Sequence, residues 1–172
     1  MPINKWVAAV VAATLERTRS YFEEEFDIKV ADISQDSGNV ATLDIHGLTA
    51  IVGVGGPVSL LVAFSFDQRL MEVLYARMTD GIEVLAGEEE MYRGSVAAEI
   101  INTIIGNCTA DLQQRDEAIT LTPPMIIDSA KHIHRMKNAV FISRCLNSEF
   151  GSVDINLVGP GELFDSGLNY VK

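Results

Sequence analysis

Apolar residues recur at helical spacing in three stretches of the chain, and this pattern predicts three helices. The first covers residues 3–26, where five apolar side chains fall near one stripe. The second runs from Asp67 to about Met78. The third covers residues 87–115 and opens with three glutamates, which suit the positive end of the helix dipole. The apolar stripe of the first helix consists of Trp6, Val7, Val10, Val11 and Leu15.

Shorter runs of β-branched and apolar residues, separated by glycine, proline and polar residues, predict β-strands. They lie within 28–66, within 117–127 with a break at Pro123-Pro124, and over 138–146 and 150–158. Because these strands mostly follow one another without a helical crossover, hairpins and antiparallel pairing are favoured. The order of elements predicts an α+β fold in which a helix-plus-antiparallel-strand unit is loosely duplicated.

Two glycine-rich stretches interrupt the predicted strands. Gly53 to Pro57 could be a phosphate-binding loop, but a strand-like run follows it instead of a helix, and no Lys-Ser or Lys-Thr pair follows. We therefore predict that its glycines are turn residues. Gly159-Pro160-Gly161 is interpreted as the end of the last strand.

Length and charge narrow the classes of function. The chain has 172 residues, which predicts a single domain over residues 1–172. Its 24 acidic and 13 basic residues give a net charge of −11, and a surface of that sign repels duplex DNA and anionic membranes. No apolar run is long enough for a membrane-spanning helix. We therefore expect neither nucleic acid nor membrane as a partner.

The apolar stretch 6–15, which follows Lys5, also resembles a short signal peptide. A helix is the better interpretation, because Glu16, Arg17 and Arg19 continue the pattern without a helix breaker or a clear cleavage region. The protein is therefore expected to be cytoplasmic.

The two cysteines cannot form a disulfide framework and do not pair as metal ligands. We expect Cys108 and Cys145 to be reduced core residues, as is usual in the cytosol.

One histidine pair is a possible metal site. His132 and His134 would face one side of a strand, but no third ligand stands at a familiar spacing. Lys131, Arg135 and Lys137 would also repel a cation, so no metal site is predicted. A docking patch for an acidic partner and a solvated loop both stay open as interpretations of this basic cluster.

The long helix over 87–115 is the most informative segment. On a wheel of about 100° per residue its apolar residues form a core face, and a narrow stripe lies opposite. Glu99 and Asn102 on that stripe are three apart, which places their side chains roughly 5–6 Å apart at Cβ. Gly106 costs a helix about 1 kcal/mol relative to alanine, which makes sense if a partner approaches closely. From residue types alone, a plain solvated face also stays open. The core face holds Ala97, Ile101, Ile104, Ile105, Cys108 and Leu112, and the stripe holds Ser95, Glu99, Asn102, Gly106, Ala110 and Gln113.

This stripe resembles the signature helix of the CheC/CheX/FliY family, which are phosphatases of the phosphorylated chemotaxis response regulator CheY. The run Glu99-x-x-Asn102-x-x-x-Gly106 is preceded by Ser95, and 21 residues separate Asn102 from Pro124. No second Glu-x-x-Asn occurs in the sequence. CheC-type members commonly carry two such helices and CheX carries one, so the chain is most similar to CheX and is expected to have the CheC-like fold.

The resemblance implies a mechanism and a partner. Asn102 would hold a water in line with the phosphorus of a receiver's aspartyl phosphate, since a carboxamide can donate and accept hydrogen bonds at once. Glu99 would pair with the receiver's lysine, while Ser95, Gly106 and Gln113 would contact the phosphorylated CheY-like receiver domain. The Mg²⁺ would belong to the receiver, so no cofactor of the chain's own is expected.

Two other functions stay open. The first is a catalytically silent receiver-binding or flagellar-switch-like scaffold of the same fold. The second is an unrelated α+β ligand-binding module, which a deep apolar pocket away from the long helix would favour. The resemblance also implies a homodimer built through the sheets, for which the strand-rich edge 138–158 is a possible surface.

Overall fold

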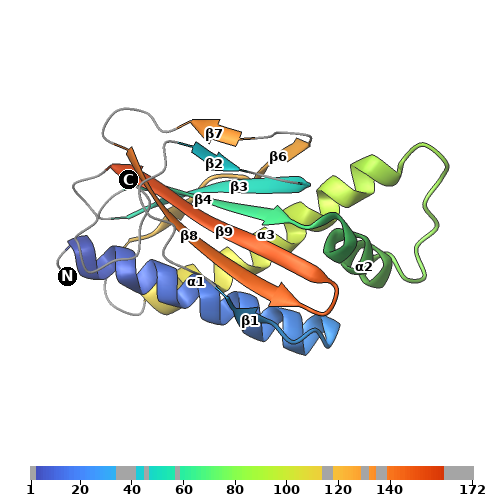
Figure 1. Ribbon diagram of the computed structural model, residues 1–172, viewed down its shortest axis with the longest axis horizontal. Coiled ribbons are helices and arrows are strands. Elements are labelled where there is room, and N and C mark those ends of the chain that lie inside the picture. The colour runs from blue at the N-terminus through green and yellow to red at the C-terminus, as the bar shows by residue number, and fades with distance from the viewer. Residues whose placement is uncertain are drawn as a thin grey trace.

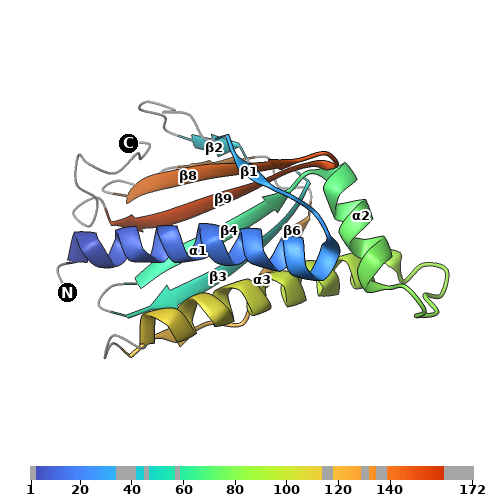
Figure 2. The same ribbon diagram turned by 90° about the horizontal axis from the view of Figure 1, so that it is seen from below.

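The computed structural model describes residues 3–33, 42–44, 47–56, 59–113, 118–128, 132–134 and 139–160. Two long helices, α1 (Ile3–Phe26) and α3 (Glu89–Gln113), lie across one face of a β-sheet and run in opposite directions (Figures 1 and 2). A shorter helix, α2 (Gln68–Met78), lies at one end of the sheet. The three helices are confirmed, and their ends lie within two residues of the predicted ones.

The main sheet has seven strands in the order β1-β8-β9-β4-β3, and β5 and β6 pair with successive parts of β3. A separate two-stranded sheet pairs β2 with β7. Every strand pairing in the described part of the chain is antiparallel, which confirms the predicted α+β class. The strands are β1 (Ala31–Asp32), β2 (Thr42–Asp44), β3 (Leu48–Gly55), β4 (Ser59–Phe66), β5 (Thr120–Leu121), β6 (Met125–Asp128), β7 (His132–His134), β8 (Ala139–Ser148) and β9 (Gly151–Pro160).

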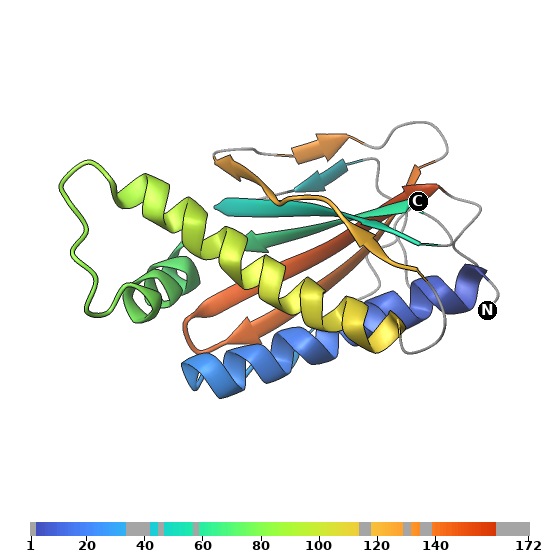
Figure 3. The ribbon, with the colours of Figure 1, turned by 180° about the vertical axis from the view of Figure 1, so that it is seen from behind.

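The core lies between the two long helices and the sheet (Figure 3). Alternate residues of the central strands point into it, as the two-residue period of a strand requires. On β4, for example, Val62, Phe64 and Phe66 are fully buried there. From the helix side Trp6 and Phe22 of α1 are also fully buried, so the segment that resembles a signal peptide is part of the core. No helix in the described residues is both long and apolar enough to cross a membrane.

Helix α2 is fixed at both ends by polar contacts. Asp67 caps its N-terminus, because its carboxylate accepts a hydrogen bond of 2.9 Å from the backbone N–H of Arg69. Arg77 in its last turn donates to the carbonyl of Phe26, the final residue of α1. The guanidinium of Arg77 also lies 5.3 Å from the centroid of the Phe150 ring. These contacts tie α2 to the C-terminal end of α1 and to the β8–β9 hairpin.

The prediction that the glycines from Gly53 to Pro57 are turn residues is wrong for two of them. Gly53 and Gly55 belong to β3. The segment around β5 runs alongside them as an antiparallel neighbour at close distance. A Cβ on Gly53 would stand 2.9 Å from Cγ2 of Thr122, whose hydroxyl accepts a 2.8 Å hydrogen bond from the Gly53 N–H. The glycines therefore make room for this neighbouring segment and do not form a phosphate-binding loop.

Of two smaller predictions, the end of the last strand is confirmed and the burial of one cysteine is wrong. Strand β9 ends at Gly159 and Pro160, as predicted, and Gly161 lies outside the described residues. Cys108 is buried and forms no disulfide, as predicted, whereas Cys145 also forms no disulfide but is only partly buried, so it is no core residue. Cys145 lies next to Leu146 on β8, and because side chains alternate it points away from the core that Leu146 enters.

Candidate functional site

The candidate site is the outward side of α3, which is held in place by the buried side beneath it. The predicted core positions are all buried, from Ala97 to Leu112. Three further residues are buried that the wheel did not assign: Val96, Ile100 and Thr109. The buried arc is wider than one apolar stripe because α3 contacts both α1 and α2 as well as β3 and β6 of the sheet.

The predicted polar stripe is on the surface. Ser95, Glu99, Asn102 and Gln113 are exposed, and Gly106 is partly exposed. Within the part of the chain that the structure describes, neither the Glu99 carboxylate nor the Asn102 amide has a hydrogen-bond or ion-pair partner. Two adjacent polar groups on a rigid helix are therefore free to bind something outside the chain.

The other members of the stripe are less available. The Ser95 hydroxyl donates a 3.0 Å hydrogen bond to the carbonyl of Met91, one turn earlier in α3. The Gln113 amide donates a weak bond of 3.4 Å to the carbonyl of Ile119. A Cβ on Gly106 would meet nothing within 4 Å, so the surface above it is open. Gly106 thus leaves the backbone of α3 accessible at the middle of the stripe.

Helix α1 contributes a neighbour that the sequence patterns did not reveal. Burial raises the pKa of the Tyr21 hydroxyl above its usual value, a hydrogen bond with Thr103 lowers it, and the carboxylates of Glu25 and Glu99 raise it further. Tyr21 therefore lies beside Thr103, within range of the Glu99 charge, and is a neutral phenol at physiological pH. No spacing rule links residue 21 to residue 99, because only the packing of α1 on α3 brings them together.

A bidentate ion pair joins the two long helices nearer the C-terminus of α3. Arg17 Nε lies 2.7 Å from Oδ2 of Asp111, and Nη2 lies 2.5 Å from Oδ1. This guanidinium lowers the pKa of the Asp111 carboxyl, mainly through the hydrogen bonds. The pair is partly exposed, so it fixes geometry more than it stabilises the fold.

Cys108, on the buried side of α3, is not a nucleophile. Burial raises the pKa of the Cys108 thiol to about 11, and Thr14 is its hydrogen-bonding neighbour at 3.7 Å. A thiol with such a pKa is protonated at neutral pH, whereas nucleophilic cysteines act as thiolates. Covalent catalysis through this residue is therefore disfavoured.

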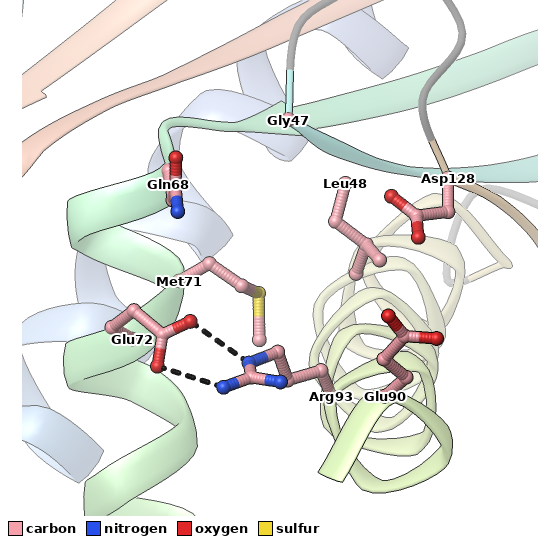
Figure 4. A pocket seen from close by; sticks show the side chains of 8 residues that line it. All are labelled: Gly47, Leu48, Gln68, Met71, Glu72, Glu90, Arg93 and Asp128. Carbon is pink, nitrogen blue, oxygen red and sulfur yellow. Dashed lines mark hydrogen bonds and ion pairs between the residues drawn. The ribbon is translucent and has the colours of Figure 1, made fainter.

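A hollow of about 500 Å³ lies near the start of α3, between this helix and α2 (Figure 4). The residues of α3 that line it are Glu90 and Arg93, whose helical spacing places them on a different side of α3 from the stripe. Arg93 crosses it and pairs with Glu72 of α2, with its Nε 2.8 Å from Oε1 and its Nη2 3.2 Å from Oε2. The guanidinium of Arg93 also lies 5.0 Å from the centroid of the Tyr75 ring. Glu90 and Asp128 line it together with Leu48 and Met71, so its lining is mixed and it is not the deep apolar pocket that would favour a ligand-binding module.

The prediction that the chain has no metal site can be compared with the described residues only. Among those, no group of three or more His, Cys, Asp or Glu side chains is arranged to hold a metal ion. His132 and His134 stand on β7 opposite Asp44 and Thr42 of β2. The flanking Lys131, Arg135 and Lys137 lie outside the described residues, so the two interpretations of the basic cluster stay predictions.

Comparison with known proteins adds to this geometry. The family model described as "Chemotaxis phosphatase CheX" matches residues 48–144, which is more than half of the chain and includes all of α3. The sequence matches no curated protein.

Several solved structures share the fold. The chemotaxis protein CheX from Desulfovibrio desulfuricans superposes with a TM-score of 0.72 at 12% identity, covering 86% of this chain and 97% of that one. CheX in a CheX–CheY–BeF3–Mg²⁺ complex from Borrelia burgdorferi gives 0.60 at 16% identity, covering 87% and 96%. FliY from Thermotoga maritima gives 0.58 at 13% identity, covering 94% and 91%. These likenesses confirm the CheC-like fold.

Proposed function

This chain belongs to the CheX family of chemotaxis phosphatases, and on that basis we propose that it dephosphorylates a phosphorylated CheY-like receiver domain. One observation of the structure carries the proposal. Glu99 and Asn102 are exposed on the same side of a rigid helix, and neither has a hydrogen-bond or ion-pair partner within the described part of the chain. That CheX from Borrelia burgdorferi forms a complex with CheY supports a receiver as the partner.

Asn102 is the residue to which we assign catalysis. Its amide would accept one hydrogen bond from a water and hold it in line with phosphorus, as a glutamine does in GTPases. The water oxygen then bonds to phosphorus while the bond from phosphorus to the aspartyl oxygen breaks. The products are inorganic phosphate and a free aspartate carboxylate, and the water gives up its proton to solvent or phosphate. No intermediate forms on this chain.

Glu99 is the residue to which we assign docking. Its carboxylate would pair with the lysine of the receiver active site, and a charge-assisted hydrogen bond of this kind is short and directional. One turn separates Glu99 from Asn102, so this pairing would fix the position of the amide at the phosphoryl group. The receiver would supply the Mg²⁺ and the labile acyl phosphate, so the chain needs no cofactor of its own and acts in the cytoplasm with its partner.

The test compares two asparagines of the same helix. Asn102→Ala should lower the turnover number for the phosphorylated receiver by about 100-fold or more, because removal of one positioned polar group costs this much in other enzymes. Asn107→Ala is the matched control, since Asn107 is also exposed on α3 but lies off the stripe. Loss of receiver phosphate is followed with time at catalytic amounts of protein.

Binding separates the phosphatase from the silent scaffold. If the wild-type protein binds the receiver but does not speed the loss of phosphate, the phosphatase proposal is wrong and the scaffold takes its place. Equal turnover by Asn102→Ala and the wild type would leave the phosphatase intact but remove Asn102 from the mechanism.

We also infer a homodimer through one specific strand. Of the predicted edge 138–158, β9 lies between β8 and β4 and cannot pair further. In contrast, β8 pairs with β1 at Leu146 and Asn147 and accepts one more bond from the Ile33 N–H at Cys145, so residues 139–144 have no neighbouring strand on that side in the described structure. An unpaired edge is a template for a second chain. Sedimentation equilibrium should give the mass of two chains, and a monomer at all concentrations would refute this.

A further inference from the structure

The connection between α2 and α3, together with the first turn of α3, carries a group of exposed apolar side chains. Ile82 is 52% exposed, Leu85 57% and Met91 62%, all within ten residues of the chain. The connection extends beyond the end of the sheet, at the N-terminal end of α3 (Figures 2 and 3). Single exposed apolar residues are ordinary, but several together mark an interaction site.

This connection has a defined conformation of its own. The N–H of Ile82 donates to the carbonyl of Thr79 at 2.9 Å, and the N–H of Glu88 donates to the carbonyl of Leu85 at 3.0 Å. Gly81 and Gly87 adopt φ values of +77° and +90°, which glycine tolerates and other residues rarely do. Ile82 and Leu85 are therefore presented on two turns that the backbone holds in place, and Met91 follows in the first turn of α3.

Met91 belongs to the same side of α3 as the candidate site. It precedes Ser95 by four residues and Glu99 by eight, and residues at this spacing share one face of a helix. The contact between the Ser95 hydroxyl and the Met91 carbonyl links the two directly. The exposed stripe thus continues from Asn102 past Ser95 to Met91 and ends at the connection.

A protein–protein interface of standard size is large enough to cover α3 from Met91 to Asn102. At 1.5 Å per residue, Met91 lies about 16 Å along the axis from Asn102. A typical interface buries about 800 Å² on each partner, equal to a disc of about 16 Å radius. A disc centred on Ser95 would therefore include both Met91 and Asn102. A partner seated on the candidate site would meet the start of α3 as well.

The charge around these apolar residues selects among partners. Five carboxylates and one guanidinium lie between residues 80 and 93. In a symmetric contact between two copies the same patch would face itself, so the two acidic connections would repel each other. A partner with basic residues around an apolar surface would be attracted. The charged residues are Asp80, Glu83, Glu88, Glu89, Glu90 and Arg93.

We propose that Ile82, Leu85 and Met91 form a second contact surface for the receiver domain that docks on Glu99 and Asn102. This inference rests on the proposed function and adds to it the surface that supplies affinity. The matching surface on the receiver is apolar and bordered by lysine or arginine. The stripe would then supply the chemistry, and the connection would hold the receiver through apolar contact.

The test compares two sets of exposed apolar residues in the full-length protein. The triple variant Ile82→Ser, Leu85→Ser, Met91→Ser removes the proposed surface. The control variant is Leu61→Ser, Met125→Ser, whose side chains are 48% and 62% exposed and belong to strands β4 and β6. Dissociation constants are measured with a CheY-like receiver from the same genome in the presence of BeF3⁻ and Mg²⁺. Turnover numbers are measured at saturating phosphorylated receiver, and sedimentation gives the oligomeric state.

The triple variant should bind the receiver about tenfold more weakly, with its turnover number unchanged, while the control binds as the wild type does. Equal affinity of triple variant and wild type would overturn the inference and leave the phosphatase proposal standing. A changed oligomeric state with unchanged receiver affinity would overturn it too, because the partner would be a second copy. If the wild type binds the receiver without turnover, the phosphatase proposal fails. The receiver affinities of the triple variant and the wild type still decide whether the second contact surface exists.

Discussion

Helices α1 and α3 have nearly equal length and cover the same face of the sheet, yet their outward sides differ in kind. On α1 the exposed side is ionic, and Arg19 pairs with Glu16 at 3.5 Å. On α3 the exposed stripe holds Glu99 and Asn102 without a partner among the described residues, and Gly106 without a side chain. Their inward sides are alike, because both bury large apolar residues against the sheet.

This difference shows how a surface helix can be prepared for contact. Long charged side chains that pair with each other stay hydrated and keep other molecules away from the backbone. Short, uncharged or absent side chains let another protein approach closely, and an unpaired carboxylate is available to pair with a cationic group of that protein. The inward sides build the fold, so comparison of the outward sides isolates function from stability.

Truncation of buried side chains on the inward sides of α1 and α3 should lower the free energy of unfolding by similar amounts. These are the largest effects that we expect. Phe22→Ala on α1 should lower the free energy of unfolding by about 3–5 kcal/mol, and Ile101→Ala on α3 by about 2–5 kcal/mol. Both side chains are fully buried, so each change removes apolar contacts and leaves a cavity. Urea denaturation measures the loss. A cost below about 1 kcal/mol at either site would mean that this helix does not share the core.

The outward sides should respond differently to the same substitution. Glu99→Gln removes the charge proposed to pair with the receiver, so its dissociation constant should rise by roughly 10–100-fold, the worth of a charge-assisted hydrogen bond. Glu16→Gln on α1 should leave receiver binding unchanged. Isothermal titration of both variants checks this. Equal effects would show that general acidity, and not the position of Glu99, governs binding.

Replacing Gly106 on α3 should make the fold more stable but hinder the approach of the receiver to the helix. Gly106→Ala should raise the free energy of unfolding by about 1 kcal/mol, because the new methyl group meets nothing within 4 Å. On α1 the reverse change at the exposed Ala12, Ala12→Gly, should lower it by a similar amount. Thermal melts measure both. Receiver affinity should fall with Gly106→Gln and be unaffected by Ala12→Gly, and the opposite pattern would contradict a close approach at Gly106.

Local patterns were enough to predict most elements of this fold. The helical period placed α3, Asp67 stood where a helix cap was needed, and Pro123-Pro124 separated β5 from β6. The exposed stripe was also predictable, because apolar periodicity defines which side of a helix is left for solvent. These features depend on neighbours in the sequence.

What escaped prediction depends on residues far apart in the chain. Gly53 resembled a turn residue because its contact with Thr122, 69 positions later in the chain, cannot be predicted from the residues next to Gly53. Tyr21 was missed for the same reason, since packing of α1 on α3 places it beside Thr103 and within range of the Glu99 charge. Ile100 and Thr109 were left off the core face because the wheel assumes one covered side, whereas α3 is covered on several.

The ion pairs at the two ends of α3 bear on its motion. Arg93 ties its second turn to Glu72 of α2, and Asp111 ties its last turn to Arg17 of α1. Between these two points the helix is buried along its inner side. Local fraying is thereby confined to the ends, and backbone amides from about Val96 to Thr109 should exchange with solvent only when the whole domain opens. The backbone positions of Glu99 and Asn102 then keep one fixed separation on the microsecond-to-millisecond timescale on which partners arrive and leave, while their exposed side chains change rotamer faster.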